Sequence, residues 1–168
     1  MHPVYIREAQ EGDREAMWSI FEAVIKTGDT YVFLPDTPRS DLDQYWLAPY
    51  MHTYVAEVDG DAVGTYILKA NHPGLGSHVA NASYMVHPAD QGKGVGSAMC
   101  AHSLEEARQM GFRAMQFNLV ISTNEAAIHL WEKMGFAIVG ALPGAFFQQE
   151  LGYVDAYIMF KSLVETGE

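Results

Sequence analysis

The sequence predicts a single α/β domain in which a mixed sheet carries helices on both faces. Strand-like segments with alternating apolar residues come first, and helical and strand-like segments then take turns toward the end. This order is typical of a sheet with helices packed on either side. A length of 168 residues suits one domain with a real core, and we expect that domain to span residues 1–168.

The first part of the chain predicts a strand over residues 3–8 and then a helix. Asp13 is a candidate cap for this helix, and its buried face would consist of apolar residues at helical spacing: Met17, Ile20, Phe21, Val24 and Ile25. Two prolines and several turn formers predict a loop over residues 28–38. Residues 40–48 are expected to form a second, short helix.

A hairpin is predicted in the middle of the chain. Asp59-Gly60 is a strong signal for a tight turn, and it joins strand-like residues 53–58 to 62–69. Residues 71–76 then read as a loop, and residues 79–86 as a strand.

The last part alternates between helix and strand. We expect helices and strands in the order helix, strand, helix, strand, strand, over residues 95–110, 113–121, 122–134, 136–141 and 153–161. Gly111 suits the left-handed position that ends the first of these helices, and Gly135 closes the second. The pattern Ser122-x-x-Glu125 resembles a capping box at the start of that second helix.

The bulk composition excludes several classes of function. The formal net charge is −11, with 21 acidic against 10 basic residues, which disfavours nucleic acids and anionic membranes as partners. Such a charge suits small cationic or zwitterionic substrates, or simply solubility. One cysteine, Cys100, excludes an intrachain disulfide, and its place in a helix indicates a small buried side chain. The seven histidines show no metal-ligand spacing, so no metal site is expected.

We expect a cytoplasmic location, because the chain opens with no secretory leader and contains no apolar run near the length of a membrane span.

The most informative motif is the glycine-rich segment Gln91-Gly92-Lys93-Gly94-Val95-Gly96, which lies between a strand-like run and a helical run. Glycines at alternate positions let the backbone turn tightly and leave its N–H groups uncovered. A helix that starts there points its positive end at a bound anion, which makes the segment a phosphate-binding device. It is not the dinucleotide fingerprint, because Gly96 comes one residue too early, and it lacks the Walker A pattern.

Two blocks of the sequence resemble the GCN5-related N-acetyltransferases, the GNAT family. Gln91-x-x-Gly94-x-Gly96 is similar to that family's pyrophosphate loop for acyl-CoA, and residues 124–136 (NEAAIHLWEKMGF) are similar to its late helix. The resemblance covers roughly residues 50 to 161. It implies the GNAT fold, with a mixed, mostly antiparallel central sheet.

The resemblance also implies acetyl-CoA as the cosubstrate. Its pyrophosphate would be bound by loop amides, which we assign to Gln91, Gly92, Gly94, Gly96 and Ser97. Lys93 would add a charge contact or stay solvated. The strand edge at Tyr84, Met85 and Val86 would pair with the pantetheine arm.

Asn81 and Asn118 stand out because each lies in the middle of a predicted strand, where asparagine is depleted. A residue that breaks a local rule inside a core element often marks function. The alternative is a buried amide whose hydrogen bonds are satisfied by a neighbouring backbone.

A narrower resemblance links the chain to the proline-analogue (azetidine-2-carboxylate) and L-amino acid N-acetyltransferases. It rests on residues 30–33, 81–86, 116–120 and 152–156. It implies that Asn81 holds the substrate carboxylate with help from the backbone amides of Asn118 and Leu119. It also implies that Asn124 faces the CoA sulfur and supports catalysis, since a side-chain amide can donate to a leaving thiolate. A helix cap is the structural alternative for Asn124.

The chain departs from the family at Trp131, where many members have a tyrosine that protonates the thiolate. An indole N–H only donates a hydrogen bond, so we expect Trp131 to serve packing. No clear general base is visible, and the weak candidates are Glu57, His78 and Asp155.

The predicted function is direct acetyl transfer from acetyl-CoA to the amine of a small molecule, an amino acid or a toxic analogue, by a protein that the resemblance implies to be a homodimer. Two alternatives stay open. The amine could belong to a polyamine, an aminoglycoside or a protein N-terminus, or the domain could bind CoA as a sensor without catalysis.

Overall fold

The computed structural model describes residues 2–165. The chain divides into two compact units. Unit 1 contains the residues up to Lys69 together with Ser83–His102, and unit 2 contains Ala70–Ala82 together with the residues from Ser103 onward. One strand and one helix, β4 (Val79–Val86) and α3 (Val95–Gln109), run through both units.

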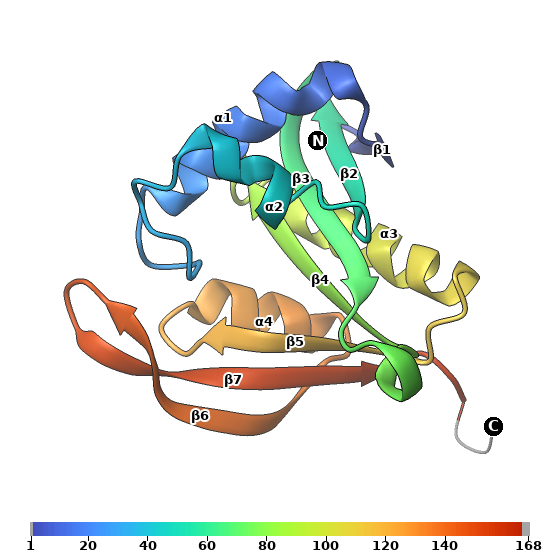
Figure 1. Ribbon diagram of the computed structural model, residues 1–168, viewed down its shortest axis with the longest axis vertical. Coiled ribbons are helices and arrows are strands. Elements are labelled where there is room, and N and C mark those ends of the chain that lie inside the picture. Colours follow the sequence, from blue (N-terminus) through green and yellow to red (C-terminus); the bar gives the residue numbers. More distant parts are fainter. Residues whose placement is uncertain (1, 166–168) are drawn as a thin grey trace. The chain divides into compact units, whose positions relative to one another are not determined.

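The strands follow the order β1-β2-β3-β4-β5-β7-β6 in a seven-stranded sheet (Figure 1). Besides β4, the strands are β1 (Tyr5–Glu8), β2 (His52–Val58), β3 (Asp61–Ala70), β5 (Ala114–Ile121), β6 (Ala137–Gln148) and β7 (Gly152–Ser162). β4 and β5 are parallel, whereas the pairs β1/β2, β2/β3, β5/β7 and β6/β7 are antiparallel. The predicted mixed, mostly antiparallel sheet is therefore confirmed.

The helices are α1 (Arg14–Ile25), α2 (Leu42–Tyr45), α3 and α4 (Glu125–Lys133). Short 3-10 turns precede α1, α2 and the loop before α3, at Glu11–Asp13, Arg39–Asp41 and Pro88–Asp90, and a fourth, Gly74–Gly76, joins β3 to β4. Among these helices none is both long and apolar enough to cross a membrane, within residues 2–165.

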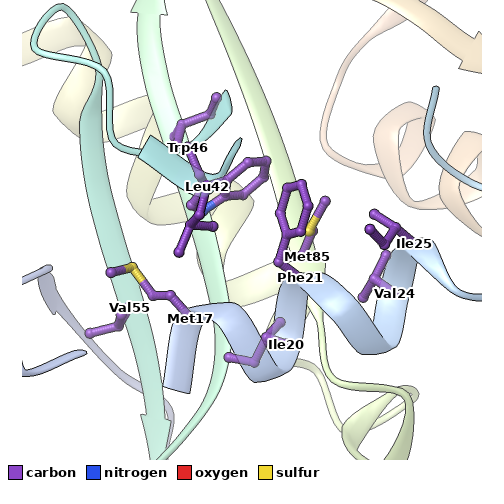
Figure 2. Packing of buried hydrophobic residues seen from close by; sticks show 10 residues of the cluster. Met17, Ile20, Phe21, Val24, Ile25, Leu42, Trp46, Val55 and Met85 are labelled. Atoms are coloured by element: carbon purple, nitrogen blue, oxygen red, sulfur yellow. The ribbon is translucent and has the colours of Figure 1, made fainter. Parts of the chain in front are cut away.

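Unit 1 has a core between α1, α2 and the strands. All apolar residues predicted for the buried face of α1 are buried: Met17, Ile20, Phe21, Val24 and Ile25. Figure 2 shows the Phe21 ring beside Trp46 and Met85. The Phe21 and Trp46 rings meet edge to face, with centroids 5.9 Å apart. The buried indole N–H of Trp46 donates to Thr65 Oγ1 at 2.9 Å, so a fully buried tryptophan carries no unsatisfied donor.

Alternate residues of the unit 1 strands face different helices. Val55 and Ile67 belong to the cluster that packs on α1. Their neighbours Tyr54 and Tyr66 stack on each other at 4.6 Å and contact the ring of His102 in α3. Because side chains alternate across a strand, α1 and α3 cover opposite faces, as predicted for helices on both faces.

Unit 2 packs α4 against the strands through aromatic rings. Phe117 of β5 stacks on Phe136 with centroids 4.3 Å apart and contacts Trp131 of α4 at 4.9 Å. In this unit β7 lies between β5 and β6 in the sheet, although it follows β6 in the chain (Figure 1).

Two turn predictions are confirmed by backbone geometry. Asp59 and Gly60 have φ values of 54° and 89°, as a tight hairpin turn with left-handed residues requires. Gly111 has φ of 87° just after α3, and the N–H of Phe112 donates back to Ala107 O at 3.0 Å.

Three local predictions were wrong. Asp13 does not cap α1 with its side chain, because a 3-10 turn leads directly into the helix and the carboxylate binds Arg7 and the N–H of Gln10 instead. Ser122 does not start α4; Asn124 occupies the N-cap. β6 extends to Gln148, well past the predicted end at residue 141, because register shifts let the strand continue through Pro143 and Gly144.

The Arg7–Asp13–Glu57 group gives a prediction for stability against pH. Arg7 donates to Asp13 at 2.8 and 2.9 Å and to Glu57 at 2.6 Å, and its hydrogen bonds to Asp13 lower the pKa of that carboxyl. Because the pKa is lower in the folded state, the stabilisation is present above about pH 4 and is lost as the pH falls through the folded value. Asp13→Asn should lower the free energy of unfolding by about 1–2 kcal/mol at neutral pH.

Urea unfolding between pH 2 and 7 checks this expectation. The curves of the wild type and Asp13→Asn should converge at the acid end, whereas the exposed Asp36→Asn should follow the wild type throughout. If the difference in free energy of unfolding between the wild type and Asp13→Asn does not change with pH, the stabilisation does not come from the charge of Asp13.

Candidate active site

The glycine segment forms an exposed loop that ends at the start of α3. Gly92 and Gly94 have φ values of 76° and 84°, in the left-handed region that glycine favours. The first helical hydrogen bond of α3 runs from the N–H of Ala98 to Gly94 O at 3.0 Å. The three N–H groups that follow Gly94, at Val95, Gly96 and Ser97, therefore have no acceptor within the helix.

The loop has room for an anion. An ideal Cβ placed on Gly92 or Gly94 meets no other atom within 4 Å. Lys93 is exposed, and its Nζ lies 2.9 Å from Asp90 Oδ1. The loop therefore presents main-chain donors and the positive end of a 15-residue helix, with a lysine held beside an acid.

The strand before the loop has side chains on both sides of the sheet. Met85 lies in the core beside α1, Tyr84 is buried, and Val86 is half-buried. The hydroxyl of Tyr31 donates to the main-chain oxygen of Tyr84. Burial raises the pKa of Tyr31, so its phenol stays a neutral donor. Tyr31 has no role that the sequence alone reveals, because this contact joins residues that are 53 positions apart.

Asn81 is buried in the first half of β4, with 8% of its surface exposed. Its Nδ2 donates to the main-chain oxygen of Gln116 at 3.0 Å. This is the backbone-satisfied amide that the sequence analysis left open as an alternative. It uses one of two amide protons, so the second remains available to a ligand.

Asn118 and Leu119 form a β-bulge. In the β5–β7 register, Phe117 pairs with Met159 and Val120 with Tyr157. The residues Asn118 and Leu119 thus face the single residue Ile158. A bulge interrupts the ladder and leaves its extra residue unpaired, and bulges are common next to active sites. Nothing in the local sequence predicts it.

A chain of side-chain amides lies at this bulge in unit 2. Gln116 Nε2 donates to Asn118 Oδ1 at 3.0 Å, and Asn118 Nδ2 donates to Asn71 Oδ1 at 2.7 Å. The structure therefore brings Asn81, Asn118 and Leu119 together with two residues that the sequence analysis did not single out, Asn71 and Gln116. Asn71 lies in a loop full of turn formers, where an asparagine carries no signal.

Asn124 is the N-cap of α4. Its Oδ1 accepts a hydrogen bond from the N–H of Ala127 at 3.2 Å. The cap occupies only the side-chain oxygen, which fixes the orientation of the amide and leaves its Nδ2 protons to donate elsewhere. A structural role and a catalytic role for Asn124 are therefore compatible.

Of the remaining candidates, all but His78 have structural partners for their side chains in the part of the chain that the structure describes. Trp131 contacts Phe117, in keeping with a packing role. Glu57 pairs with Arg7, Asp155 Oδ1 accepts from the N–H of Gly144 at 3.0 Å, and His78 is exposed. Within residues 2–165, no group of three or more His, Cys, Asp and Glu side chains is placed to hold a metal ion.

Comparison with known proteins decides the family. The model of the acetyltransferase (GNAT) family matches residues 15–136, which include the glycine loop, the β5 bulge and Asn124. The chain belongs to the GNAT family. Its resemblance to that family, inferred from the loop and the late helix, is thereby confirmed.

Several relatives of this GNAT chain are known. N-acetyltransferase aca1 of Schizosaccharomyces pombe is 36% identical over 112 residues, which cover 66% of this chain and 54% of the yeast protein. The chain thus spans about half the length of that relative. L-amino acid N-acetyltransferase AaaT of Escherichia coli is 30% identical over 166 residues, covering 95% and 98% of the two chains.

The fold of this GNAT chain also matches a solved structure closely. A GCN5-related N-acetyltransferase from Kribbella flavida superposes with a TM-score of 0.90 at 36% identity, and the match covers 95% of this chain and 97% of that one.

Proposed function

We propose that this GNAT chain is an acetyl-CoA-dependent N-acetyltransferase that acts on the amine of an amino acid or an amino-acid analogue. The observation that carries the proposal is the exposed glycine loop at the N-terminus of α3, where main-chain N–H groups converge without helical acceptors. The name of the Escherichia coli relative AaaT, an L-amino acid N-acetyltransferase, supports the amino-acid substrate.

The loop residues would bind the diphosphate of acetyl-CoA. Gln91, Gly92 and Gly94 are exposed residues, and the N–H groups of Gly96 and Ser97 belong to the first turn of α3. Lys93 would add a positive charge shared with Asp90. The main chain at Tyr84, Met85 and Val86 would bind the pantetheine arm. Because Tyr31 already donates to the main-chain oxygen of Tyr84, most hydrogen bonds to the pantetheine arm would come from main-chain groups farther along β4.

Unit 2 would bind the carboxylate of the amine substrate. The main-chain N–H groups of the bulge residues Asn118 and Leu119 are the proposed donors, together with the second amide proton of Asn81. Hydrogen bonds from several N–H groups to one carboxylate are charge-assisted and directional. This arrangement favours substrates that carry a carboxylate near the amine.

The reaction needs no covalent enzyme intermediate. Acetyl-CoA supplies the acetyl group as a thioester. The neutral amine forms a bond to the acetyl carbon as the carbon–sulfur bond breaks; the nitrogen then loses a proton and the thiolate gains one. Asn124 Nδ2 would donate a hydrogen bond to the sulfur as its negative charge develops. The rest of the rate enhancement would come from positioning the two substrates, acetyl-CoA at the glycine loop and the amine at the β5 bulge.

Thiol release from acetyl-CoA tests the proposal. The purified protein is mixed with a panel of L-amino acids, imino acids, polyamines, aminoglycosides and peptides, and free CoA is followed with a thiol reagent. We expect the highest kcat/KM for an amino or imino acid. Faster turnover of a polyamine, an aminoglycoside or a peptide N-terminus would instead assign the enzyme to one of those amines. Tight CoA binding without turnover of any amine would indicate a sensor.

We also propose that the protein forms a homodimer. Large apolar side chains are exposed on the β6–β7 hairpin, including Phe147, Leu151 and Tyr153, which are 56%, 67% and 78% exposed. Apolar groups gathered on one face often mark an interface. Light scattering coupled to size exclusion should give twice the chain mass of 18.6 kDa, and the mass of one chain would contradict the proposal.

A further inference from the structure

The amide chain at the β5 bulge has a direction. Each bond is donated by one side-chain nitrogen to the oxygen of the next residue, from Gln116 to Asn118 and from Asn118 to Asn71. The chain therefore ends on the oxygen of Asn71, and its Nδ2 group remains at the end. Within residues 2–165 this Nδ2 donates to no other group.

Asn71 is held in place from two sides. Its main-chain N–H donates to Val79 O at 2.8 Å, which ties the residue to the first position of β4. Its side-chain oxygen accepts from Asn118 Nδ2 at 2.7 Å, which ties it to the bulge. Asn71 is a half-buried residue, and these two contacts fix the position of its amide, whose Nδ2 can donate two hydrogen bonds.

The Nδ2 group of Asn71 belongs to a residue that is hydrogen-bonded to Asn118, one of the residues proposed to bind a carboxylate. Asn118 is both the side-chain partner of Asn71 and one of the bulge residues. Asn81 joins the same group through the main-chain oxygen of Gln116. All of these residues belong to unit 2.

We propose that Asn71 determines specificity for amine substrates that carry a carboxylate. Its Nδ2 donates a hydrogen bond to the carboxylate bound at the main chain of Asn118 and Leu119. The inference rests on the proposed function and adds a residue to it. The charge-assisted bond is formed with an amino acid and is weakened with an amine whose carboxylate has been replaced by a neutral amide.

Asn71→Asp tests this role while preserving the network. Aspartate keeps the oxygen that accepts from Asn118, so the bulge keeps its side-chain anchor, but it replaces the donor with a negative charge. We expect KM for the best amino acid of the panel to rise about tenfold, equivalent to about 1.4 kcal/mol. KM for the primary amide of the same amino acid, KM for acetyl-CoA and kcat should change little.

Two further variants act as controls. Asn71→Ala removes the donor without adding a charge and should raise KM for the amino acid in the same direction by a smaller factor. Gln44→Glu adds the same charge at an exposed position in α2 and should have no effect. Thermal unfolding of each variant establishes that it is folded.

The outcomes separate the two proposals. Equal changes of KM for the amino acid and its amide, or no change in either, would overturn the role of Asn71 and leave the enzyme assignment intact. If the wild type releases no thiol with any amino acid, the proposed function fails and the role of Asn71 fails with it.

Discussion

Replacing Asn124 with aspartate should lower kcat for acetyl transfer by about 100-fold, the typical effect of removing one donor from a developing negative charge. The structure shows that Asn124 caps α4 with its oxygen, at 3.2 Å from the N–H of Ala127. Aspartate caps helices equally well, so the fold and its stability should be preserved. What aspartate lacks is the Nδ2 donor, and it would bring a carboxylate toward the leaving thiolate.

Steady-state kinetics and thermal unfolding together separate catalysis from capping. Asn124→Ser also keeps a capping oxygen and should be stable but slow. Asn124→Ala loses the cap as well, so it should be destabilised by about 1 kcal/mol in addition to being slow. If Asn124→Asp is stable and keeps the wild-type kcat, the residue is a cap and nothing more.

Replacing Gly94 with alanine should raise KM for acetyl-CoA by about 30-fold, equivalent to about 2 kcal/mol. Gly94 has φ of 84°, which costs an L-residue about 1–2 kcal/mol. The methyl group would also stand where no protein atom lies within 4 Å, in the space that we assign to the diphosphate. The dissociation constant of CoA, measured by calorimetry, should rise by the same factor. The value of kcat at saturating acetyl-CoA should stay near that of the wild type.

Gly111→Ala provides a matched control for this experiment. Gly111 lies at the other end of α3 with nearly the same φ, 87°, and an equally open surrounding. Both variants should lose a similar amount of stability. Only Gly94→Ala should weaken the binding of CoA, and a parallel loss in both variants would show that general strain, not the loop, is responsible.

The sequence predicted most of the fold, because the signals were local. The α1 stripe from Met17 to Ile25, the turn at Asp59-Gly60 and the glycine loop each depend on neighbouring residues. The error at Asp13 arose because a side chain from another element competed with a local rule. Asp13 had the chemistry of a cap, but Arg7 from β1 took its carboxylate.

In the candidate site too, some residues could be predicted from local motifs and others depend on contacts that the sequence does not reveal. The loop residues and Asn124 could be picked out from motifs and from the family resemblance. The bulge at Asn118 and Leu119 depends on how β5 aligns with β7, whose paired residues lie 35 or more positions away. The contact between Asn71 and Asn118 spans 47 positions, and both are amides of ordinary appearance in the sequence. Such pairs become visible only when the register of the sheet is known.

The position of β7 between β5 and β6 has a consequence for biosynthesis. β5 ends at Ile121, but its antiparallel partner begins only at Gly152. While the intervening residues are being made, β5 has no partner strand on its β7 side, and the buried residues Ala156 and Met159 are not yet present. The bulge at Asn118 and Leu119 is defined by pairing with β7, so it can form only when this late strand docks, and the carboxylate site that we propose in unit 2 would form after that step.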